Sequence, residues 1–75
     1  MTNDVTNPDY YKNSKIECIE AITEAVKELK GIDAFCTANV IKYLWRWNKK
    51  NGVEDLKKAK WYIERLISNH AEKVE

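Results

Sequence analysis

The residues best suited to binding chemistry lie in the middle of the chain. Four of them recur at helical spacing and are called the basic stripe here: Asn39, Lys42, Arg46 and Lys50. This spacing places them in one narrow strip of a helix, with Tyr43 beside it. Converging cations bind phosphate, and the planar fork of arginine matches phosphate oxygens. The stripe therefore predicts a phosphate-binding surface; the alternative is a helix face that only meets water.

Other kinds of site have little support. Gly31 and Gly52 are the only glycines, which excludes a glycine-rich phosphate loop of the Walker kind. Cys18, Cys36 and His70 lack the spacing of a zinc site. We predict no resident metal, and magnesium only where a nucleotide is bound. No serine or cysteine pairs with the single histidine in a recognisable pattern, so the sequence leaves open whether the protein is an enzyme.

Charge is nearly balanced over the whole chain but unevenly distributed. The formal net charge is +1, whereas residues 40–60 hold seven basic residues against two acidic ones. A local excess of this kind attracts phosphates or an acidic protein surface. Dedicated nucleic-acid-binding proteins are usually basic overall. The pI of about 7.7 therefore makes nucleic acid the weaker alternative as a partner.

Apolar periodicity predicts an all-α protein, namely a three-helix domain with an irregular N-terminal arm. Residues 1–13 form the predicted arm, residues 14–70 the helical domain, and residues 71–75 an end that frays. The helices are predicted at about residues 14–29, 33–50 and 53–70. Gly31 and Gly52 suit the ends of the first two, because glycine tolerates positive φ.

The second predicted helix divides into two sides. Its apolar side, which we expect to be buried, contains Val40, Ile41, Leu44 and Trp47. The basic stripe lies on the opposite side. We therefore expect the stripe to remain accessible to a ligand.

Aromatic residues are numerous for a chain of 75 residues. Trp45, Trp47 and Trp61 do not easily share one small core, and Trp61 lies nearly opposite the apolar side of its helix. An outward aromatic indicates a second packing surface. We predict that Trp45 and Trp61 are interface residues and that self-association completes the domain, since small domains bury little surface alone. Stacking of bases on a cationic surface is the alternative.

The predicted cellular compartment rests on features that the sequence lacks. No stretch approaches the roughly 20 apolar residues of a transmembrane helix, and the polar amino terminus shows no signal-peptide pattern. Two cysteines are too few for a disulfide scaffold of the secreted kind. We therefore predict a cytoplasmic protein that has no membrane partner and whose thiols are reduced.

Two blocks of the sequence are distinctive enough for comparison with known families. One runs from Asn39 to Trp47 after Phe35 and Cys36, and the other spans residues 51–62 with the Asn-Gly pair at its start. In these blocks, and more weakly over about residues 8–67, the chain resembles a small family of tailed-phage proteins of uncharacterised function. A similar module lies within a podovirus nucleoside monophosphate kinase that also lacks a Walker loop.

The resemblance implies a phage or prophage origin, a place in the cytoplasm of the bacterial host, and a link to nucleotide metabolism. Nucleotide kinase-like activity is implied by the resemblance alone. It adds Asp55 and Lys58 to the stripe, and we include Tyr11 from the arm. The expected ligand-binding residues for a nucleotide or other phosphate ligand are then Asn39, Lys42, Tyr43, Arg46, Lys50, Asp55, Lys58 and Tyr11. The alternative function is a protein-interaction module that binds or inhibits a host factor.

Overall fold

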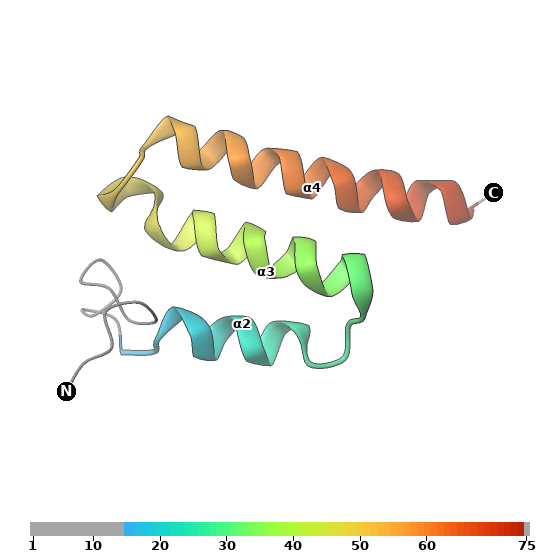
Figure 1. Cartoon of the computed structure of the whole chain (residues 1–75), viewed down its shortest axis with the longest axis horizontal. Helices are drawn as coiled ribbons and strands as arrows, with labels where there is room; N and C mark the ends of the chain where they lie inside the picture. The colour runs from blue at the N-terminus through green and yellow to red at the C-terminus, as the bar shows by residue number, and fades with distance from the viewer. Residues whose placement is uncertain (1–14, 75) are drawn as a thin grey trace.

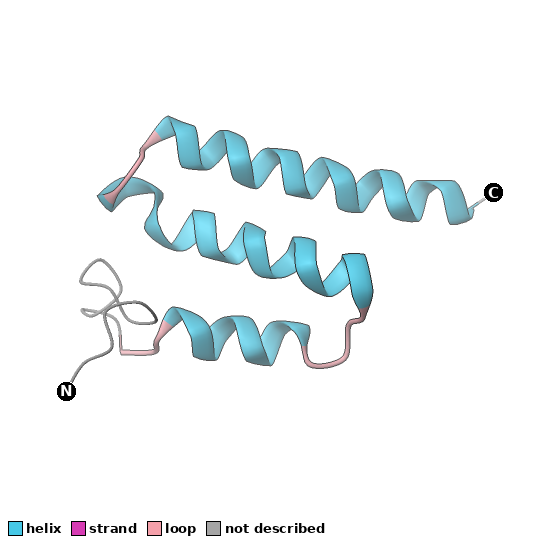
Figure 2. Ribbon diagram, viewed as in Figure 1, coloured by secondary structure: helices cyan, strands magenta, loops and turns pink. Residues whose placement is uncertain are grey.

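Three helices lie side by side in the computed structural model, which describes residues 15–74 (Figure 1). They are α2 (Cys18–Val26), α3 (Gly31–Arg46) and α4 (Val53–Val74), with a short 3-10 helix η1 (Trp47–Lys49) after α3. Over the described range no strand occurs (Figure 2). The predicted all-α, three-helix architecture is confirmed.

The helix boundaries differ from the predicted ones by a few residues. α2 begins at Cys18, where the Glu17 backbone N–H donates to Glu20 Oε1 at 3.2 Å, as in a capping box. α3 changes to the tighter 3-10 geometry after Arg46. α4 continues to Val74, beyond the end predicted at residue 70.

Both glycines adopt the left-handed conformation that the sequence predicts. Gly31 has a φ of 54° and Gly52 a φ of 59°. The Gly52 N–H donates to the Trp47 carbonyl at 2.7 Å, which closes the turn between η1 and α4. Gly31 lies at the start of α3 rather than at the end of α2. A side chain at either position would strain the backbone even where space is available.

The middle helix, α3, makes most of the packing. It contacts α2 on one side and α4 on the other, whereas α2 and α4 touch each other at most marginally (Figure 1). Among the described residues the buried apolar side chains are only Cys18, Cys36 and Ala59. Within residues 15–71, eleven large apolar side chains are instead at least 38% exposed. So small a core is marginal for a domain of this size.

A polar cluster joins the start of α3 to the end of α4. Asp33 Oδ1 accepts a hydrogen bond from Asn69 Nδ2 at 3.1 Å and lies 2.9 Å from His70 Nε2. The second helix was predicted to begin at about residue 33, whereas α3 begins at Gly31 with Lys30 as its N-terminal cap. Within the described range no helix is both long enough and apolar enough to cross a membrane.

Candidate functional site

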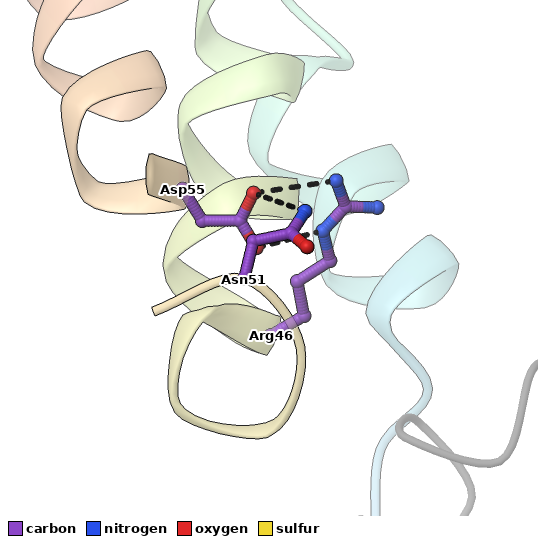
Figure 3. A network of polar contacts seen from close by, with 3 residues as sticks. All are labelled: Arg46, Asn51 and Asp55. Carbon is purple, nitrogen blue, oxygen red and sulfur yellow. Dashed lines mark hydrogen bonds and ion pairs between the residues drawn. The ribbon is translucent and has the colours of Figure 1, made fainter. Parts of the chain in front are cut away.

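Arg46 and Asp55 form an ion pair beside the turn that joins α3 to α4 (Figure 3). Arg46 Nε donates to Asp55 Oδ2 at 3.1 Å, and Nη2 donates to Oδ1 at 3.4 Å. Asn51 Nδ2 also donates to Oδ1, at 3.1 Å. Asp55 is 0% exposed and Arg46 is 8% exposed. Because both carboxylate oxygens have donors, the pair is well satisfied despite its burial.

Burial and neighbouring charges shift the pKa values of Asp55 and Cys18 in opposite directions. Burial alone raises the pKa of Asp55, but hydrogen bonds from Arg46 and Asn51 and the charge of Arg46 outweigh it, so the pKa lies below its ordinary value. Burial also raises the pKa of the Cys18 thiol, and the charges of Lys42 and Arg46 offset this only in part. Asp55 is therefore ionised at neutral pH, while Cys18 is a neutral, unreactive thiol.

The lowered pKa of Asp55 predicts a loss of stability in acid. The ionised form contributes stability above the unfolded-state pKa of about 3.9, and this contribution is lost as the pH falls through the lower folded-state pKa. We expect the free energy of unfolding of the native protein to decline below about pH 4. Urea denaturation between pH 7 and pH 2 measures this decline.

The matched control for the acid experiment removes the titrating group without leaving a buried charge. In the double variant Arg46→Met/Asp55→Leu, the decline below pH 4 should be clearly shallower than in the native protein. Equal slopes would show that other carboxyl groups cause the acid loss.

The ion pair changes the interpretation of the basic stripe. Arg46 is buried beside the turn, and Asn39 Nδ2 donates to the Phe35 carbonyl within its own helix at 2.9 Å. Lys50 lies beyond α3, exposed, in the turn that follows η1. The expectation of one continuous accessible stripe is therefore wrong. The stripe is interrupted because Arg46 pairs with a counter-ion. Asp55, in the first turn of α4, stabilises Arg46 in a buried position.

The apolar side of the same helix is more open than expected. Leu44 is 47% exposed and Trp47 is 39% exposed, although both were predicted to be buried. Val40 and Ile41 are half-buried. α3 lies between α2 and α4 and buries the two sides that contact these helices. The remaining two sides of α3 stay partly exposed. Helical phase alone does not reveal which sides those are.

Part of the predicted ligand set does converge, around the ring of Tyr43. Lys42 Nζ lies 5.4 Å from the ring centroid and Lys58 Nζ lies 5.5 Å from it. The guanidinium carbon of Arg46 lies at 4.9 Å. Cations at these distances are attracted to the electron-rich face of an aromatic ring. The structure thus brings Lys42 and Tyr43 of α3 together with Lys58 of α4.

An open pocket of about 340 Å³ lies beside this ring, and we call it the Tyr43 pocket. Its lining residues are Tyr43, Lys58, Trp61 and Tyr62. Tyr43 and Tyr62 are stacked, with centroids 6.1 Å apart and planes 16° apart. Trp61 meets Tyr62 edge-on at 5.0 Å and is 59% exposed. The pocket therefore presents aromatic surfaces next to a lysine ammonium.

Several predicted residues lie elsewhere. Trp45 is half-buried on α3, and Tyr11 lies outside the described residues. Asp55 is enclosed by Arg46 and Asn51. Among the described residues no three His, Cys, Asp or Glu side chains are grouped to hold a metal ion.

Tyr62 is the pocket residue that the sequence reasoning missed. Its one visible signal is its position four residues after Lys58, which places both on one side of α4. The ring also meets Phe35 edge-on, with centroids 5.9 Å apart. Tyr62 thus connects α3 to the pocket wall.

A family model matches most of the chain. No curated protein and no solved structure was found to match it. The model of a family described as "Protein of unknown function (DUF3310)" matches residues 5–64. That span includes α2, α3, the turn with its ion pair, and the four residues that line the Tyr43 pocket. The chain therefore belongs to the DUF3310 family.

Proposed function

We propose that this protein is a self-associating helical module that binds a nucleotide, or another phosphate ligand with an aromatic ring, in the Tyr43 pocket. The supporting observation is the convergence of Lys42 and Lys58, from different helices, on one aromatic ring beside an open pocket. Among the described residues, no carboxylate forms an ion pair with Lys42 or Lys58. Their combined charge favours an anion at the mouth of the pocket.

The pocket chemistry fits both halves of a nucleotide. The exposed ring of Trp61 offers a stacking surface for a base, a contact worth about 1–3 kcal/mol. The ammonium groups of Lys42 and Lys58 are mobile donors suited to phosphate oxygens. A volume of about 340 Å³ is at the small end of the ligand-pocket range, about 300–1,000 Å³. One mononucleotide, rather than a polymer, matches that size.

Arg46 and Asp55 have an indirect part in this proposal. Their ion pair fixes the end of α3 to the start of α4, and Arg46 lies against the Tyr43 ring. They position the pocket rather than touch the ligand. Magnesium enters only with the phosphate groups of a bound nucleotide.

The biological setting of the proposal rests on the sequence resemblance. Similarity to tailed-phage proteins, and to a module of a podovirus nucleoside monophosphate kinase, supports a role in phage nucleotide metabolism in the bacterial cytoplasm. The Tyr43 pocket lies within residues 5–64, the part of the chain that carries the family match. We therefore propose that nucleotide binding is shared by this chain and the proteins that it resembles. Kinase-like chemistry is a further activity to be assayed.

Calorimetric titration at low salt with nucleoside mono- and triphosphates tests the proposal. We expect the native protein to bind at least one of them, and Lys58→Met to weaken binding about tenfold, since a hydrogen bond to a charged group contributes roughly 1.5–3 kcal/mol. Lys57→Met is the matched control, because Lys57 is exposed on the same helix but does not line the pocket. Absence of native binding, or equal losses in both variants, would overturn the proposal.

The protein-interaction alternative has one observation in its favour, the 59% exposure of Trp61. Exposed tryptophans are enriched among the residues that dominate protein interfaces. Capture of a stoichiometric host protein that is lost in Trp61→Ala, kept in Lys58→Met, and unaccompanied by nucleotide binding would favour this alternative. A steep salt dependence of binding to single-stranded DNA would favour nucleic acid instead.

A further inference from the structure

Helical phase places a second exposed surface on the other side of the α3–α4 pair from the Tyr43 pocket. On α4, Ile63 follows the pocket residue Trp61 by two positions, roughly 200° around the helix. On α3, the ammonium group of Lys42 lies over the ring of the pocket residue Tyr43. Leu44 follows Lys42 by two positions, again roughly 200° away. Ile67 continues the α4 flank one turn later. We call this surface the back face, and its exposed apolar residues are Leu44, Trp47, Ile63 and Ile67.

We propose that the back face is covered by a second copy of this chain. This inference rests on the self-association included in the proposed function, and it adds the surface that mediates it. The pocket of each copy then points away from the interface. Ligand binding and self-association use opposite sides of the same helix pair.

The need for a permanent partner favours a second copy over another protein. Within the described part of the chain, the side chains of Cys18, Cys36 and Ala59 are the whole of the buried apolar set. A domain this small with so little core is marginally stable alone. A partner that completes the core must be present whenever the chain folds, and a second copy always is. The charge of the chain also permits two copies to associate, since two molecules that each have a net charge of +1 repel each other only weakly.

The exposed area fits the centre of a dimer interface. Leu44 is 47%, Trp47 39%, Ile63 39% and Ile67 61% exposed. These four side chains would supply the apolar centre of the ~800 Å² that each partner buries in a standard interface. The remainder is expected to be a polar rim around this apolar centre.

Two charged residues beside the back face are self-complementary. Lys60 and Glu64 each precede a back-face isoleucine by three positions, so both lie next to it on α4. Two-fold pairing brings the same patch of each copy together with its direction reversed. An axis near the middle of α4 therefore places Lys60 of one copy near Glu64 of the other. Opposite charges meet at the interface rather than like charges.

Sedimentation equilibrium of the full chain tests the inference at micromolar concentrations. The native protein is expected to be a dimer or a larger even assembly. Ile67→Glu and Leu44→Glu, on different helices, should each weaken association at least about tenfold, because a charge is forced into the apolar centre. Ile19→Glu is the matched control: Ile19 is 53% exposed and lies on α2, at the other edge of the layer (Figure 1). It should leave association unchanged.

Circular dichroism of each variant verifies that the helices remain, since all three altered side chains are already exposed in the single chain. A monomeric native protein would overturn the inference. So would an assembly that both back-face variants leave intact, or one that Ile19→Glu disrupts equally. The native chain could also be monomeric and bind a different protein through Leu44 and Ile67. That result would show that another protein, not a second copy, covers the back face.

The nucleotide titration separates this inference from the proposed function. Dissociated Ile67→Glu is expected to bind nucleotide with the native affinity, because Ile67 is remote from the pocket side of α4. A dimer that depends on the back face but binds no nucleotide would leave the inference standing and remove the ligand role.

Discussion

An Asp55→Asn variant is expected to lose about 3–5 kcal/mol of its free energy of unfolding. The substitution removes the charge that balances Arg46, whose guanidinium then remains in a site only 8% exposed. Burial of an uncompensated charge costs far more than the ion pair itself contributes. Domains of this size are stabilised by as little as roughly 5 kcal/mol, so much of the variant should be unfolded at 25 °C. Urea denaturation followed by circular dichroism measures the loss.

Two controls isolate the charge imbalance as its cause. Glu54→Gln removes the neighbouring exposed carboxylate and should change stability by less than about 0.5 kcal/mol. The double variant Arg46→Met/Asp55→Leu removes both charges and should recover most of the loss, since well-packed apolar replacements of buried pairs are often neutral. Asp55→Asn within about 1 kcal/mol of the native protein would contradict the structural role of the pair.

A Tyr62→Ala variant should be the next most damaging, with a loss of about 3 kcal/mol. The Tyr62 ring is stacked on Tyr43 and meets Phe35 and Trp61 edge-on. Its removal deletes three aromatic contacts, each worth about 0.5–1.5 kcal/mol, together with buried area between α3 and α4. Thermal unfolding monitored at the helical signal provides the measurement.

The neighbouring residue gives a sharp contrast for this prediction. Trp61→Ala removes a larger ring from the adjacent position, yet Trp61 is 59% exposed. Its stability cost should stay below about 1 kcal/mol, while its effect on nucleotide binding should exceed that of the Lys57→Met control. If Tyr62→Ala and Trp61→Ala lowered the free energy of unfolding equally, the aromatic cluster as a whole would be the source of the stability, rather than the contact between α3 and α4.

The helical architecture was predictable because local chemistry determines it. Gly31 and Gly52 have the positive φ angles that the sequence predicted, and the apolar periodicity between them is strong. Boundaries were less accurate because capping depends on particular contacts. Glu17 and Glu20, for example, start α2 a turn later than expected.

The orientation of α3 was not predictable from its own periodicity. The phase of the helix separates Arg46 from Leu44, but it does not say which of them faces a neighbour. The outcome depends on Asp55, which lies in another helix and stabilises the arginine in a buried position. A usable signal did exist: an arginine in the last turn of one helix and an aspartate in the first turn of the next, separated by a short turn.

The pocket was predictable only in part. Lys42 and Tyr43 followed from the stripe, and Lys58 from the family resemblance. Trp61, which the sequence predicts to be an interface residue, lines the pocket. Tyr62 was missed because its role comes from stacking across two helices, and such a contact leaves no trace in the spacing of a single helix.

The closeness of Arg46 and Asp55 along the chain also bears on how the molecule folds. The two residues are nine positions apart, and a loop of about ten residues closes within roughly 10–100 ns. The entropy lost on closing so short a loop is small. We therefore expect the α3–η1–α4 hairpin to form early in folding, with Arg46 and Asp55 already paired in the transition state. α2 would then dock late, so changes in α2 should mainly speed unfolding and leave the folding rate nearly constant.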